Sequence, residues 1–294
     1  MEQNNKRGYL NDQFRFFHLK DSHTAPIEYH YHDFQKIVIF FSGNVTYMVE
    51  GKVYQLMPWD ILLINHHEMH KPIIQPGVPY DRIILWLNRE FLTQDSLKQY
   101  HLDDCFQETI AKKSNLLRTE AKYRMKFSNL LHELEDSFHS KEYANELYTN
   151  TLFLQLMIVM NRMQDSAPLM ETQSSIQSNK HVDSLISYIS ENLSGDLSID
   201  ALSNALYLSS SYLMHKFKEV TGTSLHNYIT KKRLTNALEL MREGTPITTA
   251  SLQSGYSDYS TFLRTFRKVY HCTPTEYLTG KLQSSPFQGQ NYRE

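Results

Sequence analysis

The sequence predicts an α+β protein of several domains: an N-terminal antiparallel β-barrel or sandwich with flanking helices, followed by an all-α C-terminal domain. Three observations predict this division. Short β-branched and aromatic runs fill residues 27–90, helical periodicity begins near residue 118, and residues 205–278 contain a repeated helical unit. With 294 residues, of which 40% are hydrophobic, the chain is long enough to bury two cores.

The N-terminal domain is predicted over residues 1–117, because the strand signals lie there. Val45, Tyr47 and Val49 alternate with residues suited to the opposite face, and a turn at residues 50–52 separates two runs as in a β-hairpin. Several short strands at this spacing favour a small barrel or sandwich. The runs are KIVIFFSG (36–43), VTYMVEGKVYQL (45–56), WDILLIN (59–65) and RIILWLN (82–88).

Residues 118–165 are predicted to form helices. In the first helix, apolar residues fall at i, i+3, i+4, i+7 and i+11, which marks one face. A second helix, over residues 143–163, is apolar on nearly every side and must be covered on more than one. We expect it to pack against the barrel and to offer its remaining face to a subunit interface. Residues 166–180, rich in Ser, Gln and Asn, are predicted to be a linker.

The C-terminal domain, predicted over residues 181–282 with a tail at 283–294, repeats itself at an interval of 49 residues. Shifted by that interval, SGYSDYSTFLRTFRKVYHCTPTEYL (254–278) lies over ALYLSSSYLMHKFKEVTGTSLHNYI (205–229). Apolar positions match apolar positions, and basic positions also recur. Two copies of one supersecondary unit are therefore predicted. The matched pairs include Leu213 with Phe262, Phe217 with Phe266, His215 with Arg264 and Lys218 with Arg267.

Each copy has the signals of a helix, a short turn and a second helix. In the first copy, Ser198 and Ser209 are placed to cap the two helices, and Gly222 ends the second. His271 takes the place of Gly222 in the second copy, which costs stability if that residue must be left-handed. TPTE at 273–276 fits a capping box. This is the plan of a helix-turn-helix unit.

The second helix of each unit leaves one face outside its buried stripe. Such a face can lie in a DNA major groove, where Arg264 can donate a bidentate pair of hydrogen bonds to guanine. Any single residue on this face could equally occupy an ordinary surface position, but its recurrence in both copies favours DNA contact for the residues as a group. A helix predicted at about residues 225–241 connects the two units and carries Lys231, Lys232 and Arg233, which we expect on an ordinary solvated face rather than in contact with phosphates. The predicted DNA-binding residues are Ser211, Met214, His215, Lys218, Tyr259, Ser260, Leu263, Arg264 and Arg267.

Composition limits the class of protein. Cys105 and Cys272 lack disulfide or metal-ligand spacing, which fits a reducing compartment. No apolar run reaches the roughly 18–20 residues of a membrane span, and the N-terminus lacks the apolar core of a signal peptide. We therefore expect a cytoplasmic protein. Residues 180–282 carry 11 Lys or Arg and 9 Asp or Glu, a slightly basic balance that agrees weakly with a nucleic-acid partner.

The C-terminal residues resemble the AraC/XylS family of transcriptional regulators. GYSDYSTFLRTFRKVYHCTPTEYL (255–278) is similar to the family's signature of glycine-aromatic, Phe, Arg, Phe-basic and Thr-Pro-x-x-Tyr, and residues 197–229 look like its first unit. His215 departs from the usual arginine, and a neutral imidazole makes a weaker contact. Leu278 stands where the family usually has arginine. The resemblance implies sequence-specific binding to double-stranded promoter DNA, with RNA polymerase as a partner.

The strand-rich zone resembles the cupin-like sensor of the same family, through His-x-His at 30–32, a glycine turn, a Pro-Asp step and His-x-Pro at 70–72. The resemblance implies a cupin-like barrel that binds a small-molecule effector, often a sugar, and flanking helices that form a homodimer. The basic side chains can hydrogen-bond hydroxyls or a carboxylate, and Trp59 or Trp86 can stack on a sugar. Each also fits a structural role in the core. The candidate effector-binding residues are His30, His32, Lys36, His70, Arg82 and Trp86.

A metal-dependent cupin enzyme fused to a DNA-binding module is the rival hypothesis, with His30, His32 and His70 as metal ligands. Cupin enzymes place a carboxylate a few residues after His-x-His. Here that position is Lys36, whose ammonium repels a divalent cation. HHEMH (66–70) has one residue fewer between its Glu and last His than a zinc-protease helix requires. We therefore predict no catalytic residues, no bound metal and no cofactor.

The sequence thus predicts a transcriptional activator whose barrel senses a small molecule, such as a sugar, and whose helices dimerise it. Effector binding would shift a pre-existing equilibrium between arrangements of the two domains. In a third hypothesis the barrel only dimerises the regulator and binds no effector.

Overall fold

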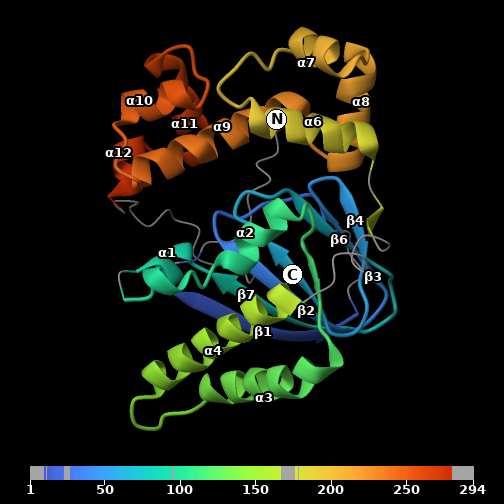
Figure 1. Ribbon diagram of the computed structural model, residues 1–294, viewed down its shortest axis with the longest axis vertical. Coiled ribbons are helices and arrows are strands. Elements are labelled where there is room, and N and C mark those ends of the chain that lie inside the picture. The colour runs from blue at the N-terminus through green and yellow to red at the C-terminus, as the bar shows by residue number, and fades with distance from the viewer. Residues whose placement is uncertain are drawn as a thin grey trace. The chain divides into compact units, whose positions relative to one another are not determined.

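The computed structural model describes residues 10, 12–22, 27–94, 96–166, 176–177 and 179–279. The chain divides into two compact units, with the boundary between Gln177 and Ser178. The first unit contains two β-sheets and several helices, and the second is helical (Figure 1). The predicted fold class, a β-rich N-terminal domain with flanking helices before an all-α domain, is confirmed. Within the described residues, no helix combines the length and the apolar character needed to cross a membrane.

The first unit is built from two antiparallel sheets. One has the strand order β1-β7-β2-β5-β8, and the other has the order β6-β3-β4-β9. The first sheet comprises β1 (Phe14–Asp21), β2 (Gln35–Ser42), β5 (Asp60–Ile64), β7 (Tyr80–Leu87) and β8 (Leu116–Arg118). The second comprises β3 (Val45–Val49), β4 (Lys52–Gln55), β6 (His70–Ile74) and β9 (Ile176–Gln177).

The strands β2, β5 and β7 of the five-stranded sheet are buried on both faces. Because successive side chains of a strand point to opposite faces, Ile83 and Leu85 of β7 join a core with the helices, while Ile84 and Trp86 face the other way. Both sheets contribute to the core on that second side, which we call the inner face. The residues of this core include Val38, Phe40, Val45, Tyr47, Tyr54, Leu62, Ile64 and Tyr80.

Helices cover the outer face of the five-stranded sheet. They are α1 (Arg89–Thr93), α2 (Asp104–Ala111), α3 (Ala121–Ser137) and α4 (Asn145–Ser166), while the 3-10 turn η1 (Lys98–Tyr100) between α1 and α2 is exposed. Figure 1 shows α3 and α4 side by side, and the two helices are in contact. The predicted stripe of α3 is buried at Phe127, Leu130, Leu131 and Leu134. Most apolar residues of α4 are buried as well, so this helix packs against the barrel as predicted.

The predicted linker lies partly outside the described residues, because 167–175 are not among them. Its ends belong to helices, since Ser166 ends α4 and Lys180 begins the next helix. Between them, β9 pairs with β4 through Ile176 and Tyr54. The predicted tail at 283–294 lies outside the described residues.

The second unit contains two helix-turn-helix units, as the repeat predicts. The first is α7 (Ile199–Leu206) with α8 (Ser210–Thr221), and the second is α10 (Ile247–Gln253) with α11 (Tyr259–Tyr270). Each has its own core, with Leu213 and Phe217 in the first and Phe262 and Phe266 in the second. The remaining helices are α6 (Lys180–Glu191), the connecting α9 (Leu225–Arg242) and α12 (Pro274–Leu278).

Side-chain caps fix where these helices begin. Ser198, Ser209 and Ser224 each accept a hydrogen bond from a backbone N–H in the first turn of the helix that follows. Asp258 does the same for α11, and Thr273 and Glu276 form the predicted capping box of α12. The α8 helix ends at Gly222, which is left-handed with φ 73°, and α11 ends at the left-handed His271 with φ 58°.

One sequence prediction about the connecting helix is wrong. Arg233 was expected on a solvated face, but its Nε donates to the Leu193 carbonyl at 3.0 Å and its Nη2 donates to the Gly195 carbonyl at 2.7 Å. These carbonyls lie in the loop before α7, so Arg233 ties α9 to the first helix-turn-helix unit. Its partner loop could not be identified from helical periodicity alone.

Candidate DNA-binding surface and candidate effector site

The second helix of each unit exposes the face opposite its buried stripe. On α8, His215 has 84% of its side chain exposed and Met214 is 50% exposed. On α11, Arg264 and Arg267 are exposed, whereas Leu263 is half-buried. The geometry therefore leaves the polar side chains of both helices available to a partner. The other predicted DNA-binding residues, all exposed, are Ser211, Lys218, Tyr259 and Ser260.

The two faces differ in charge. On α8, Glu219 lies 3.1 Å from Lys216 Nζ and 3.9 Å from His215 Nδ1, so a carboxylate offsets the charge of Lys216. The α11 helix contains no Asp or Glu and carries Arg264, Arg267 and Lys268. Since basic side chains drive attraction to phosphates, α11 presents the stronger electrostatic surface for a nucleic acid.

Backbone pairing brings the predicted sensor histidines together. His30 and His70 form an antiparallel bridge, in which each backbone N–H donates to the other's carbonyl at 3.0 and 2.9 Å. Two residues after His30, the His32 carbonyl accepts a hydrogen bond from the backbone N–H of His67 at 2.7 Å. The segment that carries His-x-His is thus held against the start of β6. The ring centroids lie 4.4 Å apart for His30 and His70, and 5.1 Å apart for His32 and His70.

All three rings are buried. Backbone carbonyls determine which nitrogen of the His30 and His70 rings carries the proton, and neighbouring groups affect the pKa of His70. The Nδ1 atoms of His30 and His70 lie 2.9 Å from the carbonyls of Glu28 and Glu68. A carbonyl only accepts, so Nδ1 carries a proton in both rings, and in the neutral form of each ring Nε2 carries the lone pair. Burial lowers the pKa of His70 well below its usual range, and His30, Lys36 and His32 act in the same direction. His70 is therefore a neutral imidazole.

Lys36 and Trp86 adjoin this histidine cluster on the inner face. They are directly opposite each other on β2 and β7, and Lys36 has only 1% of its surface exposed. The Trp86 ring lies 5.9 Å from that of His32, and Phe17 and Phe34 pack on it at 4.9 and 4.7 Å. The indole is thus held between aromatic neighbours. Phe17 and Phe34 were not among the predicted site residues, because a phenylalanine carries no polar signal in a sequence.

Arg82 lies further along the same face. Since it is four residues from Trp86 on one strand, the two Cα atoms are about 13 Å apart. Arg82 Nη1 donates to Asp21 Oδ2 and to the Tyr80 carbonyl, both at 2.9 Å, and its guanidinium stacks on the Tyr80 ring. Five of the six candidate effector residues are therefore adjacent, while the buried Arg82 forms its own ion pair with the partly exposed Asp21, a residue that the sequence did not single out.

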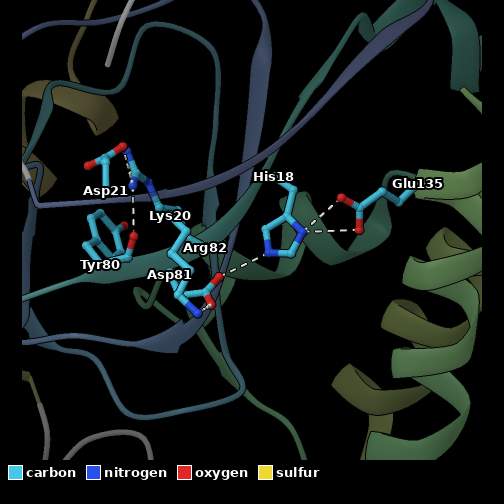
Figure 2. Close-up of polar contacts among 7 residues, drawn as sticks. All are labelled: His18, Lys20, Asp21, Tyr80, Asp81, Arg82 and Glu135. Carbon is cyan, nitrogen blue, oxygen red and sulfur yellow. Dashed lines mark hydrogen bonds and ion pairs between the residues drawn. The ribbon is translucent and has the colours of Figure 1, made fainter. Parts of the chain in front are cut away.

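Figure 2 shows how this part of the sheet is linked to the outer helices. Arg82 points toward Asp21 and Tyr80, whereas the preceding Asp81 points toward His18 on the other side of the sheet. The two ring nitrogens of His18 lie 3.0 Å from Asp81 Oδ1 and 2.9 Å from Glu135 Oε1 of α3. A continuous set of polar contacts therefore joins β1 and β7 to α3.

Two family models match the chain. The model described as the AraC-like ligand binding domain matches residues 18–157, and the model described as a helix-turn-helix domain matches residues 202–280. The chain belongs to the AraC family of transcriptional regulators. The first match covers most of the sheets and their helices, and the second covers most of both helix-turn-helix units. As an AraC family member, the chain is a DNA-binding transcriptional regulator with a domain for a small-molecule ligand.

This AraC-family chain is similar to several other proteins. The HTH-type transcriptional activator RhaR of Mannheimia succiniciproducens is 24% identical over 256 residues, which are 87% of this chain and 88% of that protein. An uncharacterized HTH-type transcriptional regulator of Staphylococcus aureus is 26% identical over 237 residues, but the match spans only 30% of its length. The solved structure of ToxT from Vibrio cholerae matches 91% of this chain and 98% of its own, with 17% identity and a TM-score of 0.36.

Proposed function

We propose that this protein activates transcription in the cytoplasm, by binding promoter DNA through both helix-turn-helix units under the control of a small polar effector. The observation that carries the proposal is the presence, in one chain, of two exposed recognition faces and a sensor with a buried polar cluster. Activation, rather than repression, is suggested by the relative RhaR, which is named as a transcriptional activator.

Base recognition is assigned mainly to α11. Arg264 is exposed on a helix face that contains no acidic residue, so its guanidinium can approach guanine and donate two parallel hydrogen bonds. On α8 the corresponding residue is His215, which lies beside Glu219. We therefore expect the first unit to contribute less to base recognition. The α9 helix has 18 residues and is therefore about 27 Å long, comparable with the roughly 34 Å of one turn of DNA.

The effector is assigned to the inner face of the sensor around Lys36 and Trp86. An ammonium group with 1% exposure favours a ligand that carries hydroxyl or carboxylate oxygens, and an indole suits a sugar ring. A carbohydrate or a sugar acid fits both groups. Arg82 lies about 13 Å further along β7 and is assigned to transmission rather than to direct contact.

A homodimer is assigned to α3 and α4. Although most apolar residues of α4 are buried, Leu147 and Ile158 are 67% and 38% exposed, and they are eleven positions apart, so they lie on one helix face. Leu154, between them, is only partly buried. An apolar stripe of this kind suits a symmetric helix interface. A dimer would present four recognition helices to one promoter, where activators contact RNA polymerase.

DNA selection followed by a point variant tests the proposal. The purified chain first selects its preferred sites from a random double-stranded library, and fluorescence anisotropy then measures affinity for the selected site. Arg264→Ala should weaken binding by about 1–3 kcal/mol and relax the preference at a single base pair. Lys141→Ala, which removes an exposed positive charge from the sensor, is the control and should leave affinity unchanged. Equal binding by Arg264→Ala at every sequence would contradict the assignment.

A further inference from the structure

The histidine cluster of the sensor has a geometry that hydrogen bonding to an organic effector does not require. His30, His32 and His70 each offer one ring nitrogen, and these three nitrogens all lie within 4.8 Å of one another. Their exposed fractions are 2%, 2% and 0%. The rings therefore meet at one buried point, although they come from two segments far apart in the sequence.

The tautomers favour a shared cation at that point. The Nδ1–H groups of His30 and His70 donate to backbone carbonyls, which orients each ring and leaves the Nε2 lone pair facing away from that carbonyl. Histidines that bind metals are almost always held in this way, by a carbonyl or carboxylate on the second ring nitrogen. The carbonyls of Glu28 and Glu68 supply the same support here.

His70 gives an independent indication. Its Nε2 atom is buried and has no hydrogen-bond partner among the residues that the structure describes. A buried acceptor left without a partner costs about 1–3 kcal/mol, so most such atoms in folded proteins are satisfied. A metal ion at the meeting point would use this lone pair.

We propose that His30, His32 and His70 form a binding site for a divalent first-row transition-metal ion in the sensor domain. Three imidazoles suit Zn²⁺, Fe²⁺ or Cu²⁺, and they are poor ligands for Mg²⁺ and Ca²⁺. With metal–nitrogen bonds of about 2.0–2.1 Å, the nitrogens of a tetrahedral site lie about 3.3 Å apart. The rings therefore have to close by about 1.5 Å or less, which small side-chain rotations allow.

Lys36 determines what completes the coordination. It is close enough to act on the pKa of His70, and an ammonium beside a divalent ion is unfavourable. The three imidazoles contribute no negative charge, and Asp21 is already engaged by Arg82. The remaining position on the metal is therefore one for an anion, such as a carboxylate, which Lys36 would also stabilise. The site thus accepts a metal ion together with an anionic ligand.

Cobalt binding tests the metal site. The full-length chain, treated with EDTA and then freed of it, should take up a single Co²⁺ ion with the intense visible absorption of four-coordinate cobalt, and Zn²⁺ should displace it. His30→Gln, His32→Gln and His70→Gln should each weaken binding at least tenfold. The control is His139→Gln, an exposed histidine after α3, which should bind as the wild type does.

Thermal denaturation separates lost binding from lost folding. Without metal, a glutamine variant that unfolds near the wild-type temperature is folded. Added Zn²⁺ should then raise the unfolding temperature of the wild type and of His139→Gln only. Binding of Co²⁺ by His30→Gln and His70→Gln with wild-type affinity, or the absence of four-coordinate absorption in the wild type, would overturn the proposal.

A substitution of Lys36 provides a second test, in which metal binding should become tighter rather than weaker. Lys36→Met should bind Co²⁺ more tightly than the wild type in the absence of added anions, because a repulsive charge is gone. Azide should change the cobalt spectrum of the wild type more strongly than that of Lys36→Met. A wild-type spectrum that does not respond to azide would rule out the open anionic position. DNA binding is measured separately, so the metal site can fail while the proposed regulatory function holds.

Discussion

Arg233 packs closely against Gly255 where the two helix-turn-helix units meet. A Cβ atom on Gly255 would lie 2.7 Å from Arg233 Nε and 2.5 Å from the Leu193 carbonyl oxygen. Gly255 also has a φ of +86°, which side chains rarely adopt. The same guanidinium donates to the carbonyls of Leu193 and Gly195. The turn of the second unit is therefore packed directly on the loop that precedes the first.

Gly255→Ala is expected to destabilise the C-terminal unit by about 2–4 kcal/mol, because a left-handed conformation and a steric clash add together. Gly244→Ala is the matched control, since Gly244 has φ +92° but no atom within 4 Å of a Cβ. It should cost only about 1–2 kcal/mol, the conformational part. Far-UV circular dichroism follows the helices during urea unfolding. Tryptophan fluorescence follows the other unit, which contains both Trp59 and Trp86. Equal losses in the two variants would contradict the close packing.

His271→Gly should stabilise the same unit by about 0.5–1 kcal/mol, because a non-glycine residue is strained at φ 58°. Gly222 occupies the equivalent position after α8. The control His271→Ala keeps a Cβ atom and should bring no gain. Urea unfolding followed by circular dichroism measures both. A gain with alanine as large as that with glycine would show that the imidazole itself, rather than the backbone, is unfavourable.

Acid should destabilise α11 through its N-cap. Hydrogen bonds from Thr261 lower the pKa of Asp258, so the carboxylate form favours the folded state. This contribution is complete above the unfolded pKa of about 3.9 and is lost as the pH falls through the lower folded value. Asp258→Asn keeps the cap but does not titrate, and should make the unfolding temperature less dependent on pH below about 4. Glu276→Gln should act in the same direction, since hydrogen bonds from Thr273 lower the pKa of Glu276. Wild-type pH dependence in both variants would exclude these caps as the cause.

Leu147→Glu combined with Ile158→Glu should convert a dimer into a monomer, because charges would be desolvated in the proposed α4 interface. Analytical ultracentrifugation should show the dissociation constant rising at least tenfold. Met57→Glu, at an exposed apolar residue of the barrel, is the control and should leave the oligomeric state unchanged. A double variant that sediments as the wild type does would place the interface elsewhere.

Local signals explain why the C-terminal unit was predictable from the sequence. Helix starts at Ser198, Ser209 and Thr273 depend on residues within one turn, and so does the end at Gly222. The repeat then related one unit to the other without any knowledge of tertiary contacts. Arg233 was misplaced because its partners, the Leu193 and Gly195 carbonyls, are brought near only by the packing of α9.

The sensor was harder to predict, because several strands of its five-stranded sheet carry apolar side chains on both faces. In β1, Phe14 and Phe16 pack toward the helices while Phe17 and Leu19 face inward, so no alternation of apolar and polar residues marks the strand. The histidine cluster depends on pairing between His30 and His70, which no local pattern encodes. In the sequence, Lys36 follows His-x-His where cupin enzymes have a carboxylate, and this argued against a metal ion. The fold nevertheless brings the three imidazoles together.

The alternation of β7 has a mechanical consequence. Arg82 turns inward to Asp21, and its neighbour Asp81 turns outward to His18, which in turn touches Glu135 (Figure 2). Because one peptide unit joins the two side chains, a ligand that pulled the guanidinium inward would also displace the carboxylate on the far side. The strand would then transmit a small movement inside the barrel through the sheet to α3 and α4 outside it.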